Sequence, residues 1–550
     1  MNSFYPYLSK RFKTVVLICP FLILLSSNQK PQEQAQKEIL NILLIVADDL
    51  GYADIGAYGG DIETPNMDRI AANGIKFSRF HTAPYCAVTR SMVLTGNDNH
   101  IAGMGAQDNV TKVEGYEGRI TDRVVTVPQL LKDKNYMTFM VGKWHLGKTE
   151  EANPHNKGFD KSFVLLEGAG NHYSNMGVLK DSISSYTENG KKTDWPEGNY
   201  STDLYTDKLI GYISEAKKAN KPFFGFAAYT SPHWPLQVDQ KYWQKYKGRY
   251  DGGYDSLRIA RLQSLKSKGI IPQNIQLPEL HPNIKPWDSL SQQEKMAESR
   301  KMELYAGMVD NLDVNIGRLI NHLKEIGEYD NTMIVIMSDN GAAAEDFFNS
   351  SFLPPDVRNT YDNTYVNMGS ANSYVSYGKQ WAEAGSAPFK YYKGYPTEGG
   401  ITTPMLISGP MVKKRGATIH SLLTLMDLAP TFYELVGVDY PKTFNGRPIS
   451  RLRGASLVPI INDEAKTVHS EDYVFGFEHR GRAIIIKGDW KLSNIDLPFE
   501  MENFKLFNLK NDMAEANDLS KVYPLVYDDL IKEWKRYEKE VGVVIPTPRD

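Results

Sequence analysis

Four short stretches of this 550-residue chain are predominantly apolar and carry no charged residue: 39–47, 136–141, 222–228 and 332–337. A strand with one wet face alternates apolar and polar residues, whereas a strand covered on both faces is apolar along its whole length. Stretches with helical spacing surround these runs, at residues 64–73, 127–134, 201–218, 291–327 and 421–436. The pattern predicts an α/β fold with a large, mostly parallel sheet sandwiched by helices.

The C-terminal part of the chain follows a different pattern. Closely spaced strand-like runs occur there, at residues 473–477, 483–486, 490–492 and 505–509, and a helical segment follows at 526–541. This arrangement is typical of a small antiparallel sheet packed against one helix. We therefore predict an α/β domain at 39–445 and a C-terminal α+β subdomain at 446–550.

The N-terminus has the features of an export signal. Three basic residues precede a 12-residue apolar stretch at 14–25, and two small serines follow it. Twelve residues are too few for the roughly 20 that a membrane-spanning helix needs. We expect residues 1–27 to be a signal peptide and residues 28–38 a polar linker. These features predict a periplasmic or secreted protein with no stable membrane anchor.

Charge and cysteine content narrow the possible functions. The chain has 63 basic and 66 acidic residues, a near balance that argues against nucleic acid as a partner. Cys86 is the one cysteine outside the predicted leader, so the mature chain has no partner for an intramolecular disulfide. With Arg90 four residues later, a helix that starts at Cys86 would lower the thiol pKa and make it reactive. The alternative is a buried cysteine that acts as a small apolar side chain.

Two of the apolar runs end in oxygen-bearing side chains. Asp48 and Asp49 follow the first run, and Asp339 and Asn340 follow the fourth. The carboxyl ends of parallel strands meet at one edge of a sheet, where ligands collect. Carboxylate and amide oxygens suit Ca²⁺ or Mg²⁺. The alternative is that these residues begin turns or cap helices.

The other two runs end near histidines. Lys143 and His145 follow the second run, and His233 follows the third. If the second strand extends this far, side-chain alternation places Lys143 and His145 on one face. A cation beside an imidazole suits the binding of an anion and the transfer of a proton. A single histidine at a strand end is otherwise a structural residue.

These segments resemble those of the type I, formylglycine-dependent sulfatases of the alkaline phosphatase superfamily, and most of all the bacterial alkyl/aryl sulfatases. The resemblance extends over nearly all of the chain that follows the predicted leader. It is carried, in order, by VADDLGYADIG, CAVTRSMVLTG, VGKWHLGK, SPHWPL, MSDNGA and YYKGYPTEGGITTP. It implies an alkaline phosphatase-like sheet and the hydrolysis of sulfate monoesters.

The resemblance further implies that a formylglycine-generating maturation enzyme converts Cys86 to 3-oxoalanine (formylglycine), whose hydrate is the nucleophile. One divalent cation is implied beside it, Ca²⁺ with Mg²⁺ as the alternative. Its implied ligands are the modified Cys86 and the four strand-end residues Asp48, Asp49, Asp339 and Asn340.

Roles for the remaining residues follow from the same resemblance. Arg90 is implied to orient the hydrate, Lys143 to bridge it to the sulfate, and His145 to act as the base that releases sulfate. His233 and Lys393 are implied to flank the ester oxygen, with His233 as the proton donor. Lys393 is identified because it stands five residues before the Glu-Gly-Gly of the last motif.

One position departs from the family pattern. The maturation signature is Cys-x-Pro-x-Arg, sometimes with Ala at the third place, and this chain has Val88 there. Val88 leaves open an unmatured binder of sulfated compounds, and a phosphodiester or phosphonate ester hydrolase of the same superfamily is a further alternative because dianions and monoanions both fit this type of pocket. The substrate is expected to be an aryl or alkyl sulfate, or else a sugar sulfate, bound between loops at 168–199 and 346–387. Three aromatic residues either line this pocket or pack in the core: Tyr173, Trp195 and Trp381.

Overall fold

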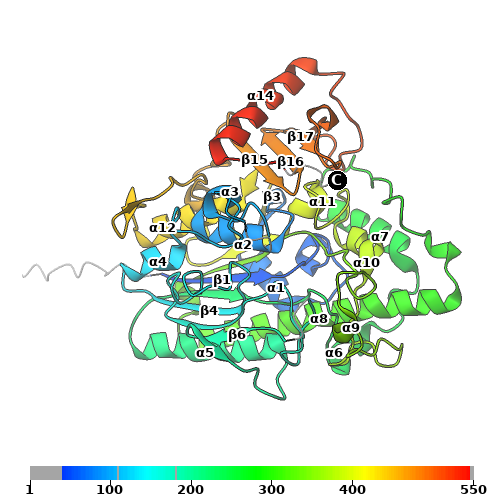
Figure 1. Cartoon of the computed structure of the whole chain (residues 1–550), viewed down its shortest axis with the longest axis horizontal. Coiled ribbons are helices and arrows are strands. Elements are labelled where there is room, and N and C mark those ends of the chain that lie inside the picture. Colours follow the sequence, from blue (N-terminus) through cyan, green and yellow to red (C-terminus); the bar gives the residue numbers. More distant parts are fainter. Residues whose placement is uncertain (1–39, 108–110, 180–182, 546–550) are drawn as a thin grey trace, which may run out of the picture. The chain divides into compact units, whose positions relative to one another are not determined.

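The computed structural model describes residues 40–107, 111–179 and 183–545 (Figure 1). The predicted signal peptide and linker lie outside the described residues. A ten-stranded sheet has the order β11-β2-β10-β9-β1-β8-β4-β5-β6-β7. Its strands are β1 (Asn41–Ala47), β2 (Ile75–Phe77), β4 (Met137–Lys143), β5 (Lys161–Leu165), β6 (Tyr186–Glu188), β7 (Lys191–Thr193), β8 (Phe223–Ala228), β9 (Thr332–Ser338), β10 (Met405–Ser408) and β11 (Ala417–Ile419).

The four apolar runs form adjacent parallel strands at the centre of this sheet. β1 lies between β9 and β8, and β4 lies between β8 and β5, with all four pairings parallel. β10 and β6 are antiparallel to their neighbours β9 and β5. The predicted large, mostly parallel sheet is confirmed.

Helices cover both faces of the sheet, and β1 shows why. Leu43 and Ile45 pack with α1 (Pro65–Asn73), α5 (Ser201–Lys218) and α8 (Gln292–Glu325). Leu44 and Val46 point the other way, toward α2 (Cys86–Thr95), α4 (Val127–Lys132) and α12 (Leu428–Val436). Because successive side chains of a strand alternate between faces, an entirely apolar strand supplies two cores at once.

One helix prediction is partly wrong. The segment 421–436 begins with a short strand, β12 (Leu423–Thr424), and a 3₁₀ turn, so its α-helix starts only at Leu428. β12 pairs with β3 (Phe80–His81). This pairing through tertiary contacts overrides the helical spacing of the first residues.

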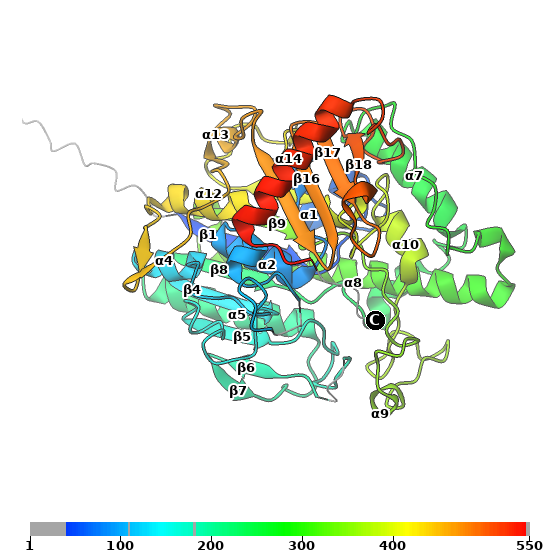
Figure 2. The same ribbon diagram turned by 45° about the horizontal axis from the view of Figure 1, so that its top comes forward.

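The C-terminal strands form the predicted antiparallel sheet. β15 (Val474–His479), β16 (Arg482–Lys487), β17 (Trp490–Asn494) and β18 (Lys505–Asn508) pair in chain order, and α14 (Pro524–Val541) lies across them (Figure 2). Trp534 and Tyr537 of α14 pack on Ile485 and Leu492. The division at 445/446 stays a prediction.

The remaining elements are short segments of the connections. The helices are α3 (Asn99–Ala102), α6 (Gln240–Trp243), α7 (Gly253–Ser267), α9 (Pro355–Arg358), α10 (Gly378–Gly385), α11 (Glu398–Ile401) and α13 (Val458–Ile461). The strands are β13 (Thr443–Phe444) and β14 (Arg447–Pro448). Among the helices of the described ranges, none has both the length and the apolar character required to cross a membrane.

Candidate functional site

The acidic residues at the ends of β1 and β9 meet because these strands are neighbours in register. Ala47 lies opposite Ser338, and the Asp339 amide donates to the Ala47 carbonyl at 3.1 Å. The Asp49 amide donates to Asp339 Oδ1 at 3.2 Å, and Asn340 Nδ2 donates to Asp49 Oδ1 at 2.6 Å. We call Asp48, Asp49, Asp339 and Asn340 the acidic cluster; all four side chains are completely buried.

Asp49 adopts a backbone conformation that side chains other than glycine seldom take. Its φ of 68° lies in the left-handed region. This turn directly after β1 lets the consecutive residues Asp48 and Asp49 both face the site. Strained backbone of this kind persists where the surrounding structure enforces it, and it concentrates at functional sites.

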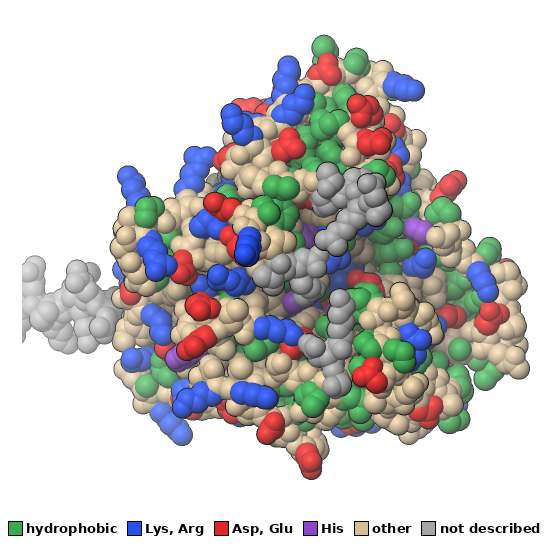
Figure 3. All heavy atoms as spheres, viewed as in Figure 1, with side chains coloured by type: hydrophobic (Ala, Val, Ile, Leu, Met, Phe, Trp, Pro, Cys, Tyr) green, Lys and Arg blue, Asp and Glu red, His purple; other side chains and the backbone are tan. Residues whose placement is uncertain are grey.

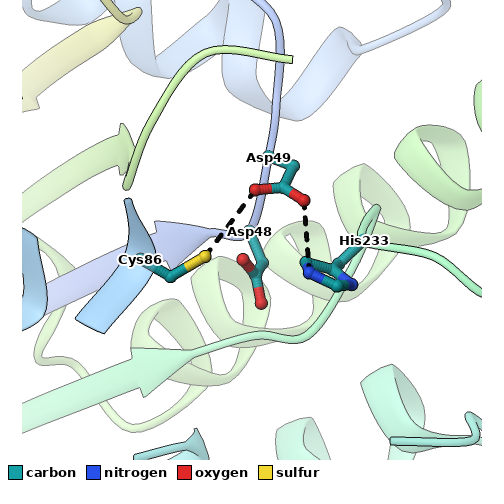
Figure 4. A group of neighbouring side chains, drawn as sticks. All are labelled: Asp48, Asp49, Cys86 and His233. Carbon is teal, nitrogen blue, oxygen red and sulfur yellow. Dashed lines mark hydrogen bonds and ion pairs between the residues drawn. The ribbon is translucent and has the colours of Figure 1, made fainter. Parts of the chain in front are cut away.

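Cys86 is the first residue of α2 and points at the acidic cluster (Figure 4). Its Sγ lies 3.8 Å from Asp49 Oδ1. Burial and the Asp339 carboxylate raise the pKa of the Cys86 thiol well above its usual value. The prediction of a reactive, low-pKa thiol is therefore wrong, because burial outweighs the start of the helix.

The hydrogen bonds of Arg90 go to Asp339 and to the backbone of β4, while its charge also interacts with the nearby Cys86 thiol. Its Nε and Nη2 donate to Asp339 Oδ2 at 3.0 and 2.8 Å, and its Nη1 donates to the Lys143 carbonyl at 2.8 Å. The guanidinium is 1% exposed. It thus ties α2 to the ends of β9 and β4 and fixes the orientation of Asp339.

The condition for placing Lys143 and His145 on one face of a strand is not met. β4 ends at Lys143, whose Nζ donates to Asp48 Oδ2 at 2.8 Å. His145 lies beyond the strand with φ 57°, so the alternation argument does not reach it. Gly168 lies against its ring, since a Cβ there would stand 2.4 Å from His145 Cε1. Burial favours the neutral form of Asp48, but Lys143 and the other cations nearby hold the Asp48 pKa far below its usual value.

His233 and Lys393 close the opposite side of the site. The Lys393 ammonium donates to Asp49 Oδ2 at 2.9 Å and to His233 Nε2 at 3.3 Å. His233 Nδ1 donates to the Trp234 carbonyl at 2.6 Å, which leaves Nε2 as the acceptor toward Lys393. Burial, followed by the Lys393 charge, lowers the pKa of His233 well below its usual value.

The site offers more acceptor oxygens than its own donors satisfy. Across the described residues, Asp48 Oδ1 and Asn340 Oδ1 are buried and receive no hydrogen bond. One ligand atom each of Asp48, Asp49, Cys86 and His233 lie within 4.8 Å of one another. Burial raises the pKa values of Asp49, to about 7, and of Asp339, and neighbouring carboxylates add to the shift. A buried site with carboxylate and amide oxygens that lack a donor fits a hard divalent cation.

Three further contacts around the site had no clear sequence signal. His172 Nε2 donates to the His233 carbonyl at 3.1 Å, and burial lowers the His172 pKa to about 4. Glu345 lies 3.7 Å from the Lys393 ammonium. Lys491 of β17 donates to Glu398, which lies five residues after Lys393, at 2.8 Å. Only Glu398 belongs to a motif; the others come from loops and from the C-terminal sheet.

Two of the candidate pocket aromatics pack in the core. Trp381 is completely buried and makes edge contacts with Tyr250 and Tyr254. Trp195 contacts Tyr186 at 5.1 Å between ring centroids and is 7% exposed. The Tyr173 hydroxyl donates to Asp239 Oδ1 at 2.8 Å.

Comparison with known proteins agrees with this geometry. The sulfatase family model matches residues 40–438, and the N-sulphoglucosamine sulphohydrolase C-terminal model matches 389–540. An uncharacterized sulfatase of Schizosaccharomyces pombe is 39% identical, with 93% of this chain and 96% of that protein covered. An arylsulfatase of Klebsiella aerogenes is 38% identical, with 78% and 93% covered. The crystal structure of Ps i-CgsB superimposes with a TM-score of 0.65 at 27% identity, with 91% and 92% covered.

Proposed function

Because this chain belongs to the sulfatase family, we propose that it hydrolyses sulfate esters with a formylglycine made from Cys86 and one divalent cation. Hydrolysis of sulfuric esters is the activity of the family. The observation that carries the finer proposal is the acidic cluster beside Cys86, with two buried oxygens that receive no hydrogen bond from any described residue. A formylglycine hydrate supplies two hydroxyls on one carbon, one to attack sulfur and one whose collapse expels sulfate.

The cation is proposed to be Ca²⁺, held by oxygens of Asp48, Asp49, Asp339 and Asn340. A cation there polarises a sulfate oxygen and lowers the pKa of the attacking hydroxyl. Lys143 and Lys393 flank this set, each bound to one of its carboxylates. They place two positive charges where the sulfate binds, in a buried setting that strengthens such interactions.

Protons are proposed to move on two sides of the site. His233 and Lys393 stand together on one side, where a proton reaches the ester oxygen of the leaving alcohol. In their hydrogen bond the proton is on Lys393 and His233 Nε2 accepts, so His233 is proposed to take this proton from Lys393 and pass it to the ester oxygen. His145 lies after β4 and is proposed to be the base for sulfate release. Arg90 is proposed to hold Asp339 in place while the nucleophile loses its proton to it.

An aromatic wall next to His233 supports a substrate with a ring. The Trp234 ring lies 4.3 Å from His233 and 5.0 Å from Phe347, measured between ring centroids. Trp234 is itself buried, so the half-buried Phe347 that packs on it is the ring that can meet an aryl group or the apolar face of a sugar. We propose an aryl or alkyl sulfate as the minimal substrate, with sugar sulfates in the same class.

Maturation is proposed to precede folding. Cys86 and Val88 are 1% and 0% exposed, and every residue of α2 is buried. A formylglycine-generating enzyme must therefore meet this segment as an extended, unfolded peptide. Val is a β-branched residue that favours extended backbone, which supports its acceptance where the family signature has Pro.

Mass analysis and turnover together test the proposal. The tryptic peptide 80–90 of protein purified from its own host should show the Cys86 thiol replaced by an aldehyde. The same preparation should release sulfate from 4-nitrophenyl sulfate, and Cys86→Ala should abolish this release. Faster turnover of a phosphate diester would favour the phosphodiesterase alternative, and an intact thiol without turnover would favour the non-catalytic binder.

Export through residues 1–27 is proposed from the sequence pattern. N-terminal sequencing of the protein recovered from the periplasm or the medium should begin near residue 28. Recovery of the full-length chain from the cytoplasm alone would contradict it.

A further inference from the structure

The hairpin between β15 and β16 carries an arginine in an unfavourable conformation. His479 pairs with Arg482, so the turn consists of Arg480 and Gly481. Their φ values of 55° and 76° are those of a type I′ turn, in which both central residues are left-handed. Asn or Gly adopts this conformation readily, whereas a long side chain is strained there. A strained residue that serves no need of the turn itself points to a use for its side chain.

The hairpin reaches the residues next to the catalytic ones. The Arg480 guanidinium lies 5.3 Å from the ring centroid of Tyr85, the residue before Cys86. The His479 ring lies 4.5 Å from the same ring. Figure 2 shows the C-terminal sheet extending toward α2, at whose first residue Cys86 stands.

A second arginine of the hairpin contacts Gly394, the residue after Lys393. Arg482 Nη1 donates to the Gly394 carbonyl at 3.0 Å, and the Tyr85 hydroxyl donates to the same oxygen at 3.3 Å. The Arg482 guanidinium also stands 4.4 Å from the Tyr395 ring. Tyr85 and Gly394 therefore link the two arginines, and they are the chain neighbours of Cys86 and Lys393.

Both guanidiniums keep donors for a ligand. Arg480 donates to the Gln107 carbonyl at 3.3 Å, and Arg482 donates to the carbonyls of Gly394 and Ile495. Within the described parts of the chain, neither pairs with a carboxylate. Each guanidinium has five N–H groups in a planar fork that matches the oxygens of an anion. Arg480 is exposed and Arg482 is half-buried, so an anion can reach them.

We propose that this hairpin tip is a subsite for a second sulfate group, so that the preferred substrates carry at least two sulfates. The inference rests on the proposed sulfate-ester hydrolysis, because the first sulfate must occupy the acidic-cluster site. Basic and acidic side chains are interspersed over the face in Figure 3. A preference for multiple sulfates therefore requires a local pair of cations rather than a generally basic surface.

Sucrose octasulfate is the probe, because it offers a second sulfate in many geometries. Calorimetry of the full chain should give octasulfate binding about 100-fold tighter than inorganic sulfate, about tenfold for each guanidinium. In the variant R480N/R482Q, octasulfate should bind only slightly more tightly than inorganic sulfate. Asn is favoured at the left-handed position, so this variant should fold as well as the wild type, as circular dichroism and thermal unfolding will show.

A matched control removes two arginines elsewhere. Arg447 and Arg451 are 68% and 87% exposed and pair with Asp122 and Glu540. R447Q/R451Q lowers the net charge equally and should keep the wild-type ratio. An equal loss in this control, or an unchanged ratio in R480N/R482Q, overturns the proposal. Trigalacturonate replaces sulfates with carboxylates, and an equal arginine-dependent gain with it would overturn the assignment to sulfate.

Turnover of 4-nitrophenyl sulfate separates the two proposals. If the wild type shows neither turnover nor an aldehyde at Cys86, the proposed mechanism fails. The calorimetric ratio still decides the hairpin proposal in that case, because it requires no turnover.

Discussion

Two buried charged clusters in this molecule are built in opposite ways. The acidic cluster leaves Asp48 Oδ1 and Asn340 Oδ1 without a donor among the described residues. A second group, which we call the histidine cluster, consists of Asp98, His100 and Glu478. His100 Nδ1 and Nε2 lie 3.0 Å from Asp98 Oδ1 and 3.0 Å from Glu478 Oε2.

The histidine cluster has a partner for each of its carboxylate oxygens. The Tyr537 hydroxyl donates to Asp98 Oδ2 at 2.7 Å, and the Gly481 amide donates to Glu478 Oε1 at 2.8 Å. Burial alone would lower the His100 pKa, but the hydrogen bonds and charges of Asp98 and Glu478 raise it to about 9. A complete network stabilises the fold, whereas an incomplete one binds what completes it. The comparison favours a structural role for the histidine cluster and supports the proposed cation site at the acidic cluster.

The largest effect is expected from Asp48→Asn. This change removes one charge from the acidic cluster and should lower kcat for 4-nitrophenyl sulfate by about 10³-fold, because the proposed cation would lose a ligand. Elemental analysis of the purified protein should show less bound Ca²⁺. Asp98→Asn is the matched change in the histidine cluster and should keep kcat per folded molecule. Full activity and metal content in Asp48→Asn would place the cation elsewhere.

The next effect belongs to the histidine cluster. His100→Gln leaves two buried carboxylates without their cation and should lower the free energy of unfolding by about 3 kcal/mol. Urea denaturation at pH 7 measures this change. His155→Gln, at an exposed histidine, should stay within about 0.5 kcal/mol of the wild type. If both substitutions changed the free energy of unfolding equally, the structural role of the histidine cluster would be contradicted.

Removal of the metal should change the free energy of unfolding by a slightly smaller amount, and only the acidic cluster should be responsible for this change. Ca²⁺ at 100 times its Kd should raise the free energy of unfolding of chelator-treated protein by about 2.7 kcal/mol. His100→Gln should show the same increment, and Asp48→Asn should lose most of it. Thermal unfolding with and without a chelator provides the measurement. An increment that survives Asp48→Asn would show that Ca²⁺ stabilises the fold from another site.

The smallest effect is a pH dependence of stability. A His100 pKa of about 9, against an ordinary 6.5, contributes stability that is complete below pH 6.5 and is lost as pH rises through 9. Between pH 7 and 9 the free energy of unfolding should fall by about 2 kcal/mol. In His100→Gln this part of the slope should vanish. A wild-type curve that rises over the same interval would contradict the sign.

Some parts of the acidic cluster could be predicted from the sequence, and others could not. Asp48 and Asp339 were predictable as neighbours, because each ends an apolar run and central parallel strands end at one edge. Lys393 could be found only through the spacing of a family motif, since its partner Asp49 lies 344 residues away. The state of Cys86 was mispredicted because burial depends on the whole fold and not on residues 86–90.

The histidine cluster escaped the sequence analysis for the same reason. A sequence can suggest that Asp98 caps α3. It cannot show that Asp98 belongs to a buried network with Glu478 and Tyr537, which lie far away in the chain. The Arg480–Gly481 turn was equally hidden, since Arg-Gly is not a strong hairpin signal. Local patterns thus predicted the strands and their ends, while contacts between distant segments decided which charges are satisfied.

The residues of the histidine cluster are synthesised at very different times. His100 closely follows α2, the helix that begins with Cys86, yet Glu478 is added 378 residues later. At ~5–20 residues per second, a ribosome needs roughly 20–80 s for that interval. For this time the segment around Cys86 lacks the strand whose His479 ring will lie 4.5 Å from the Tyr85 ring, so the proposed maturation enzyme would still meet it uncovered. If Cys86 is converted as proposed, the late synthesis of Glu478 would set the end of the period in which the enzyme can reach it.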